Sequence, residues 1–151
     1  MSEHIYKRHN KSLLLYHIVC PMKYRRKVLN DATEQTLKTT CNEIGLRYEI
    51  RFVEIGADED HVHFLIQSVP NQAPSVIVKI IKSITAKELF KLHPEIKKIL
   101  WGGHFWTSGF YINTVGQYGN ETTIKNYVHN QGRKYQQIER KQLSLFEDTP
   151  A

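Results

Sequence analysis

The sequence predicts an α+β fold, a ferredoxin-like plait in which an antiparallel sheet carries two helices on one face. The first observation is the order of the apolar segments, whose periodicities indicate strand, helix, strand, strand, helix, strand. The second is size, since 151 residues, 40% of them hydrophobic and 24% charged, can bury the core of one ordinary domain. We expect a single domain over residues 1–151, with a flexible N-terminal leader (about 1–10) and a flexible C-terminal tail (about 138–151).

Three strands are expected in the first half of the chain. Residues 12–20 are aliphatic and aromatic, and Pro21 ends the segment. Residues 47–56 and 61–68 are also rich in β-branched and aromatic side chains, and an acidic turn at 57–60 joins them. A short turn between two such segments favours an antiparallel hairpin.

Two helices are expected to alternate with these strands. Asp31 and Glu34 have the spacing of a capping box, and Gly45 is expected to stop the first helix. Pro74 suits the first turn of the second helix, which is expected to end just before Pro94. Apolar residues recur at helical spacing in both segments: Leu37, Cys41 and Ile44, then Ile77, Ile80, Ile81 and Ile84.

The last third of the chain predicts a fourth strand at residues 110–115 and a final helix of about 15 residues. Gly116 and Gly119 separate the two, and Asn120 or Thr122 can cap the helix. The first six elements complete the plait, so the C-terminal helix is an addition to it. Additions to a common fold often carry function.

The formal net charge is +6, and the excess lies in the first thirty residues. A local basic cluster suggests a polyanionic partner such as nucleic acid, although a solvated basic face has the same composition. The chain starts with polar residues and has no apolar run of ~18 residues. Its two cysteines have neither metal nor redox spacing. These features favour a cytoplasmic protein. The basic residues of the cluster are Lys7, Arg8, Lys11, Lys23, Arg25, Arg26 and Lys27.

His61-Val62-His63 is the sharpest local motif. Alternate residues of a strand point to the same face, so the two imidazoles are expected to project together, roughly 6–7 Å apart at Cα. That spacing lets both bind one metal ion, whereas two unrelated polar positions on an open sheet face would give the same pattern. A third ligand would have to come from elsewhere, and Tyr127 and Gln131 share one face of the final helix. The six other histidines have no partner pattern and are expected to lie outside a metal site: His4, His9, His17, His93, His104 and His129.

The ordered set of motifs resembles the single-tyrosine HUH transposases, which serve insertion sequences that move as single-stranded DNA. His61-Val62-His63 resembles the His-hydrophobic-His motif of that family. The segment from Tyr127 to Gln131 resembles its Tyr-x-x-x-Gln helix. The similarity runs from about residue 12 to about residue 137, and it includes residues 16–19, 23–29, 82–85, 100–103 and 114–116.

The resemblance implies a metal-dependent endonuclease and strand transferase acting on single-stranded DNA. Tyr127 would be the nucleophile, forming a 5′-phosphotyrosine link and leaving a free 3′-OH. A divalent metal, magnesium or manganese, would polarise the scissile phosphate. The implied metal ligands are His61, His63 and Gln131.

The resemblance also implies partners. Lys23, Arg25 and Arg26 would contact the phosphates of DNA hairpins at the ends of the insertion sequence. Family members are homodimers, and in many of them the tyrosine helix of one subunit completes the histidine site of the other. A bacterial or archaeal protein associated with the nucleoid is expected.

The C-terminal tail contains a separate motif. The stretch Gln142, Leu143, Ser144, Leu145 and Phe146 resembles the short peptide by which bacterial proteins bind the replication sliding clamp. Leucine and phenylalanine anchors on a flexible segment suit a hydrophobic groove, although they could equally cover the domain itself.

Two other classes of function fit parts of this pattern. A non-catalytic plait that binds single-stranded nucleic acid would make the histidine pair incidental. An HUH nickase of the replication-initiator or relaxase type, or a domesticated relative, would use the same chemistry for another purpose. Covalent capture of DNA by Tyr127 distinguishes the first of these from the transposase.

Overall fold

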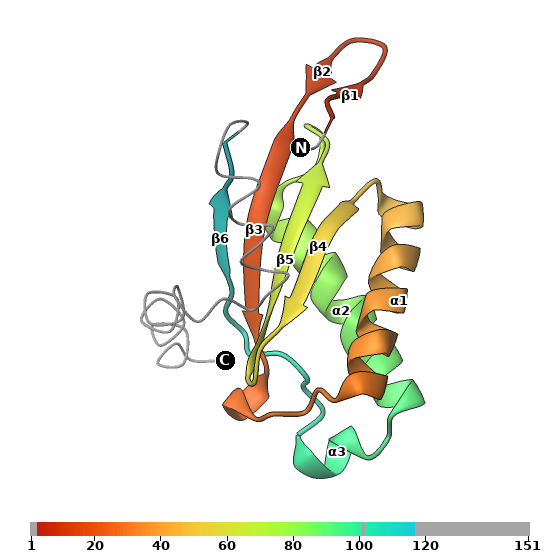
Figure 1. The fold of residues 1–151 in the computed structure, drawn as a ribbon, viewed down its shortest axis with the longest axis vertical. Coiled ribbons are helices and arrows are strands. Elements are labelled where there is room, and N and C mark those ends of the chain that lie inside the picture. Colours follow the sequence, from red (N-terminus) through yellow and green to blue (C-terminus); the bar gives the residue numbers. More distant parts are fainter. Residues whose placement is uncertain (1–2, 101, 117–151) are drawn as a thin grey trace.

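The computed structural model describes residues 3–100 and 102–116, and it confirms the plait (Figure 1). One antiparallel sheet of four strands has the order β4-β5-β3-β6, and the long helices α1 and α2 lie together on one of its faces. The predicted final helix and tail lie outside the described residues. The main elements are β3 (Leu14–Pro21), α1 (Asp31–Tyr48), β4 (Arg51–Ala57), β5 (His61–Ser68), α2 (Pro74–Leu92) and β6 (Tyr111–Thr114).

β5 is an interior strand, paired with β3 on one side and β4 on the other. All eight of its residues are buried, and its side chains alternate between the two faces. Val62, Phe64 and Ile66 join the core that the helices cover. Leu65 packs in a second cluster on the opposite face. The sheet therefore buries side chains on both faces, and His61 and His63 share their face with Leu65.

The first helix differs from its predicted form at both ends. Asn30, not Asp31, is the N-cap, and its side chain and that of Thr33 form the capping box. The helix runs through Gly45 to Tyr48, so the prediction that Gly45 stops it is wrong. A Cβ at Gly45 would lie 2.8 Å from the carbonyl oxygen of Ile50, so this glycine serves a close approach of backbone to backbone.

The structure adds short elements that the sequence did not predict. A 3₁₀ turn, η1 (Lys23–Arg25), follows β3, and the one-turn helix α3 (Ile96–Ile99) follows α2. β1 (Ile5–Tyr6), inside the predicted leader, pairs antiparallel with β2 (Lys11–Ser12), just after it, as a small separate hairpin. In Figure 1 this hairpin projects beyond the end of the main sheet.

Cys20 and Cys41 are buried free thiols in the core between sheet and helices. Burial raises the pKa of Cys20 to about 12, so this thiol stays protonated and unreactive at neutral pH. Across residues 3–100 and 102–116, no helix combines the length and apolar character needed to cross a bilayer.

Candidate active site

His61 and His63 form the centre of the candidate site. Both project from β5 on the face opposite the helices, and each side chain is about 1% exposed. Their ring centroids lie 4.7 Å apart with the rings at 69° to each other. The strand alternation thus brings two imidazoles together in a buried position, and imidazole nitrogens are common metal ligands.

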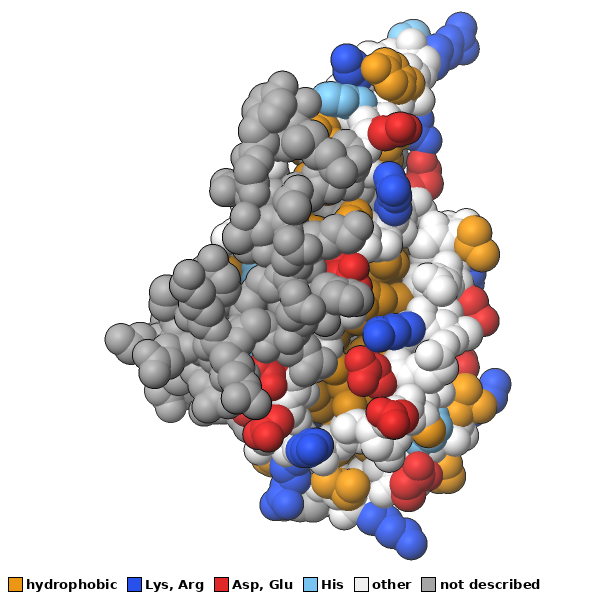
Figure 2. Space-filling model, in the orientation of Figure 1, with side chains coloured by type: hydrophobic (Ala, Val, Ile, Leu, Met, Phe, Trp, Pro, Cys, Tyr) orange, Lys and Arg blue, Asp and Glu red, His pale blue; other side chains and the backbone are white. Residues whose placement is uncertain are grey.

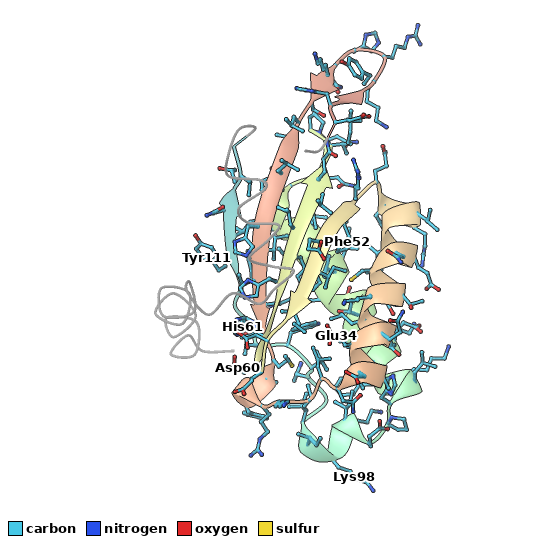
Figure 3. The ribbon with its side chains drawn as sticks, viewed as in Figure 1. Glu34, Phe52, Asp60, His61, Lys98 and Tyr111 are labelled. Atoms are coloured by element: carbon cyan, nitrogen blue, oxygen red, sulfur yellow. The ribbon has the colours of Figure 1, made fainter. Side chains whose placement is uncertain are left out.

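An acidic turn holds His61 in place. The Nδ1 atom of His61 lies 2.7 Å from Oδ1 of Asp60, and its Nε2 atom lies 3.5 Å from Oδ2 of Asp58 (Figure 3). The turn is closed by a hydrogen bond from the Asp58 amide to the His61 carbonyl. Nε2 of His61 is buried and makes no hydrogen bond to a described residue. A carboxylate on one imidazole nitrogen commonly orients the other nitrogen toward a metal.

A third histidine, His17, supports His63. The two rings are stacked, with centroids 5.3 Å apart and planes 11° apart, and Nε2 of His17 lies 3.0 Å from Nδ1 of His63. β3 runs antiparallel to β5 with His17 opposite Leu65, so the side chain of His17 falls on the histidine face beside His63. His17 was expected to lie outside the site because it has no partner motif in the sequence. The sheet register supplies that partner.

The environment keeps His17 and His63 uncharged. Burial, with a smaller contribution from the nearby His61, lowers the pKa of His17 to about 4. Burial likewise lowers the pKa of His63 well below its ordinary value, with smaller contributions from His61 and His17. A metal ligand must offer a neutral imidazole, so at neutral pH His63 is in the state that binds metal.

The donor set fits a divalent cation that needs further ligands. Each imidazole has its Nδ1 atom engaged by a neighbour, Asp60 for His61 and His17 for His63, and the unbonded Nε2 of His61 is available as a donor. No group of three or more His, Cys, Asp or Glu side chains suited to a metal occurs in the part of the chain that the structure describes. Gln131, the third ligand implied by the family resemblance, lies outside that part.

His17→Phe is expected to weaken divalent-metal binding by about 10–100-fold. Phenylalanine can still stack on His63 but cannot bond its Nδ1 atom, so the orientation of that imidazole is lost. Isothermal titration calorimetry with Mn²⁺ measures the change. The matched control is His93→Phe, because His93 bonds Thr36 on α1, away from the site. Equal Mn²⁺ affinity in His17→Phe and in the unmodified protein would show that His17 does not position the ligand.

Basic residues lie at the same end of the sheet as His61. β3 ends at Pro21, which pairs with His61, and the Met22 amide donates to the Asp60 carbonyl at 2.8 Å. η1 follows at once, so Lys23, Arg25 and Arg26 are next to the acidic turn. The Lys23 side chain is half-buried beside the ring of Tyr24, with Nζ 5.5 Å from its centroid, and Arg26 is exposed. The structure thus places this basic segment next to the histidine pair.

Several predicted site residues cannot be placed. Tyr127 and Gln131 lie outside the described residues, as do Gln142, Leu143, Leu145 and Phe146 of the tail. Asp60 and His17 are the residues that sequence reasoning missed. The signal for Asp60 was its position directly before the histidine motif. For His17 it was a lone histidine within an apolar strand.

Comparison with known proteins identifies the class. The model of the IS200-like transposase family matches residues 10–131 of this chain, a range that includes the histidine pair. The chain therefore belongs to the IS200-like transposase family.

Two relatives support the assignment. The chain is 31% identical over 121 residues to the ISDra2 transposase TnpA of Deinococcus radiodurans, an alignment covering 80% of this chain and 86% of the relative. It is 26% identical over 116 residues to the transposase for insertion sequence element IS200 of Salmonella typhimurium, covering 77% of this chain and 75% of that one.

Solved structures are also similar. A candidate transposase from Deinococcus radiodurans superposes with a TM-score of 0.69 at 28% identity, covering 84% of this chain and 97% of the other. A REP-associated tyrosine transposase bound to a REP hairpin gives a TM-score of 0.57 at 15% identity, covering 85% of this chain and 70% of the other. At 15% identity, this second similarity shows a shared fold.

Proposed function

We propose that this transposase cuts and rejoins single-stranded DNA at the ends of an insertion sequence, through a covalent link to Tyr127. The observation that carries the proposal is the buried pair His61 and His63, each with one ring nitrogen engaged by a neighbouring side chain. A chain that only binds DNA has no need for two buried imidazoles fixed in this way. Buried polar groups of this kind are costly unless they serve a site.

The chain's own residues supply a nucleophile and a metal-binding face. His61, His63 and Gln131 are proposed to hold a divalent cation, magnesium or manganese, with Asp60 and His17 orienting the two imidazoles. When bound, such a cation polarises the scissile phosphate and stabilises the charge on the leaving oxygen.

The covalent step is balanced within protein and DNA. The phenolic oxygen of Tyr127 forms a bond to phosphorus, and the bond from phosphorus to the 3′-oxygen breaks. The phenol loses its proton and the leaving 3′-oxygen gains one. Because the phosphotyrosine keeps the energy of the phosphodiester, a second 3′-OH can reverse the step and join new ends. The ordinary pKa of a tyrosine is about 10, so the phenol must be assisted to react at neutral pH.

Phosphate contacts are proposed at the basic segment beside the site. Lys23, Arg25 and Arg26 come directly after β3, at the end of the sheet where His61 lies. They are suited to hold the backbone of DNA as it approaches the histidine pair, and DNA hairpins at the element's ends are the proposed substrate. Each such contact would add about −0.7 to the salt dependence for single strands.

Further partners are proposed on the family resemblance. The protein is proposed to act as a homodimer, with the tyrosine helix able to serve the partner subunit's histidine site. The tail segment at residues 142–146 is proposed to bind the replication sliding clamp, which would bring the protein to single strands at replication forks in the nucleoid.

Covalent capture tests the proposed function. The protein is mixed with Mg²⁺ or Mn²⁺ and single-stranded oligonucleotides from the element's ends, then separated on a denaturing gel. We expect a protein–DNA adduct that requires the metal and disappears with a chelator. Tight DNA binding with no adduct under any of these conditions would favour the non-catalytic binding plait instead.

A further inference from the structure

The β1–β2 hairpin stands apart from the rest of the domain. Its two strands pair only with each other, Ile5 with Ser12 and Tyr6 with Lys11. Figure 1 shows it projecting past the end of the main sheet at which β3 begins, whereas His61 and Asp60 lie at the other end (Figure 3). At 3.3 Å per residue, the eight residues of β3 separate the two ends by about 26 Å.

The hairpin is strongly basic and exposed. Residues 5–12 include Lys7, Arg8 and Lys11 and no carboxylate, and Figure 2 shows blue side chains on both sides of the outer end of the hairpin. Lys7 pairs with Glu49 at the end of α1, whereas Arg8 and Lys11 form no ion pair with a described residue. Tyr6 is 71% exposed, and the Lys11 Nζ atom lies 5.3 Å from the centre of its ring.

The hairpin is held in place but adds little to the core. A two-stranded hairpin alone is at best marginally stable in water. Here the Gln67 side chain donates to the Glu3 carbonyl at 2.7 Å, and the Lys7–Glu49 ion pair fixes the other side. Of residues 5–12, only Ser12 is buried. The hairpin therefore adds little buried surface to the domain, and stabilising the fold does not explain why it is present. A fixed, exposed, basic and aromatic projection is suited to contact an anionic partner.

We propose that the β1–β2 hairpin is a second DNA-binding element that grips the paired stem of the substrate. A two-stranded β-ribbon fits the major groove of a duplex, where Arg8 and Lys11 reach phosphates on its walls. The basic excess of the first thirty residues is thereby divided in space: one part beside the histidine site, the other about 26 Å away on the hairpin. The stem binds at the hairpin, and its single-stranded flank runs along the molecule to the cutting site. The inference rests on the proposed function, because it takes a DNA stem as part of the substrate.

Fluorescence anisotropy tests this assignment. The unmodified protein and the double variant R8A/K11A are titrated with a labelled DNA hairpin and with a labelled oligonucleotide that cannot fold. The matched control, K91A/K98A, removes two exposed lysines of α2 and α3, which make no described ion pair. We expect R8A/K11A to lose affinity for the hairpin DNA and to lower its salt slope by about two units, while binding of the unfolded oligonucleotide stays unchanged. K91A/K98A should behave like the unmodified protein, and thermal melting of all three should agree because the changed residues are exposed.

If R8A/K11A lost affinity equally for both DNAs, or lost affinity for neither, the assignment would be overturned. Covalent capture on the unfolded oligonucleotide separates this proposal from the proposed function, since R8A/K11A should form that adduct normally. If the unmodified protein formed no adduct while R8A/K11A still lost hairpin DNA selectively, the proposed function would fail and the DNA-binding role of the hairpin would stand.

Discussion

Tyr127→Phe is expected to abolish the covalent protein–DNA adduct while DNA affinity stays the same. The substitution removes only the phenolic oxygen that would bond to phosphorus, and it keeps the aromatic ring. A phenylalanine ring carries no nucleophilic oxygen, so we expect no residual adduct rather than a slower one. Denaturing gels with single-stranded oligonucleotides and Mn²⁺ measure the adduct, and anisotropy with the same DNA measures binding.

Matched controls are available within the same segment. Tyr118 and Tyr135 are close in sequence to Tyr127, and Tyr135 shares its predicted helix face. Tyr118→Phe and Tyr135→Phe should both form the adduct at the normal level. An adduct that persists in Tyr127→Phe and disappears in Tyr135→Phe would assign the nucleophile to Tyr135 instead. Loss of the adduct in all three variants would point to a structural role for the segment.

Local patterns predicted the elements of this fold because each pattern reports on its own residues. The bounds of β5 agree with the predicted strand at 61–68, since its alternating side chains and the acidic turn before it are both local signals. Gly45 misled the prediction because a glycine after an apolar stripe usually ends a helix. A glycine is needed at this position because a Cβ would lie 2.8 Å from the Ile50 carbonyl oxygen. That contact depends on how the chain returns into β4.

The contrast between local signals and contacts made through the fold also explains which site residues the sequence predicted and which it missed. His61 and His63 are two residues apart, so strand geometry alone puts them side by side. His17 is 46 residues from His63 in sequence and reaches it only through the register of β3 on β5. A register can be fixed only once the strands are paired, so no spacing in the sequence marks His17. The basic cluster shows the converse, because two groups of basic residues within the first thirty residues lie at opposite ends of one strand.

His61→Ala is expected to remove metal-dependent cleavage, lowering adduct formation by more than about 100-fold, while DNA binding remains. His61 is the histidine that Asp60 orients, and its buried Nε2 atom makes no hydrogen bond to a described residue. Removing it takes a donor from a site that has only two described histidine donors. Adduct formation at saturating Mn²⁺, Mn²⁺ affinity by calorimetry and DNA affinity by anisotropy are the three readouts.

Asp60→Asn provides the graded comparison that assigns this loss to the metal. An asparagine keeps the size of the side chain but weakens the bond to Nδ1 of His61, so Mn²⁺ affinity should fall by about 10–100-fold. Raising Mn²⁺ should then restore adduct formation in Asp60→Asn but not in His61→Ala, because only the first variant still has the donor. His104→Ala, which removes an exposed histidine outside the pair, should match the unmodified protein. Normal cleavage by His61→Ala would exclude His61 from the site, and the assignment of the pair as metal ligands would fall with it.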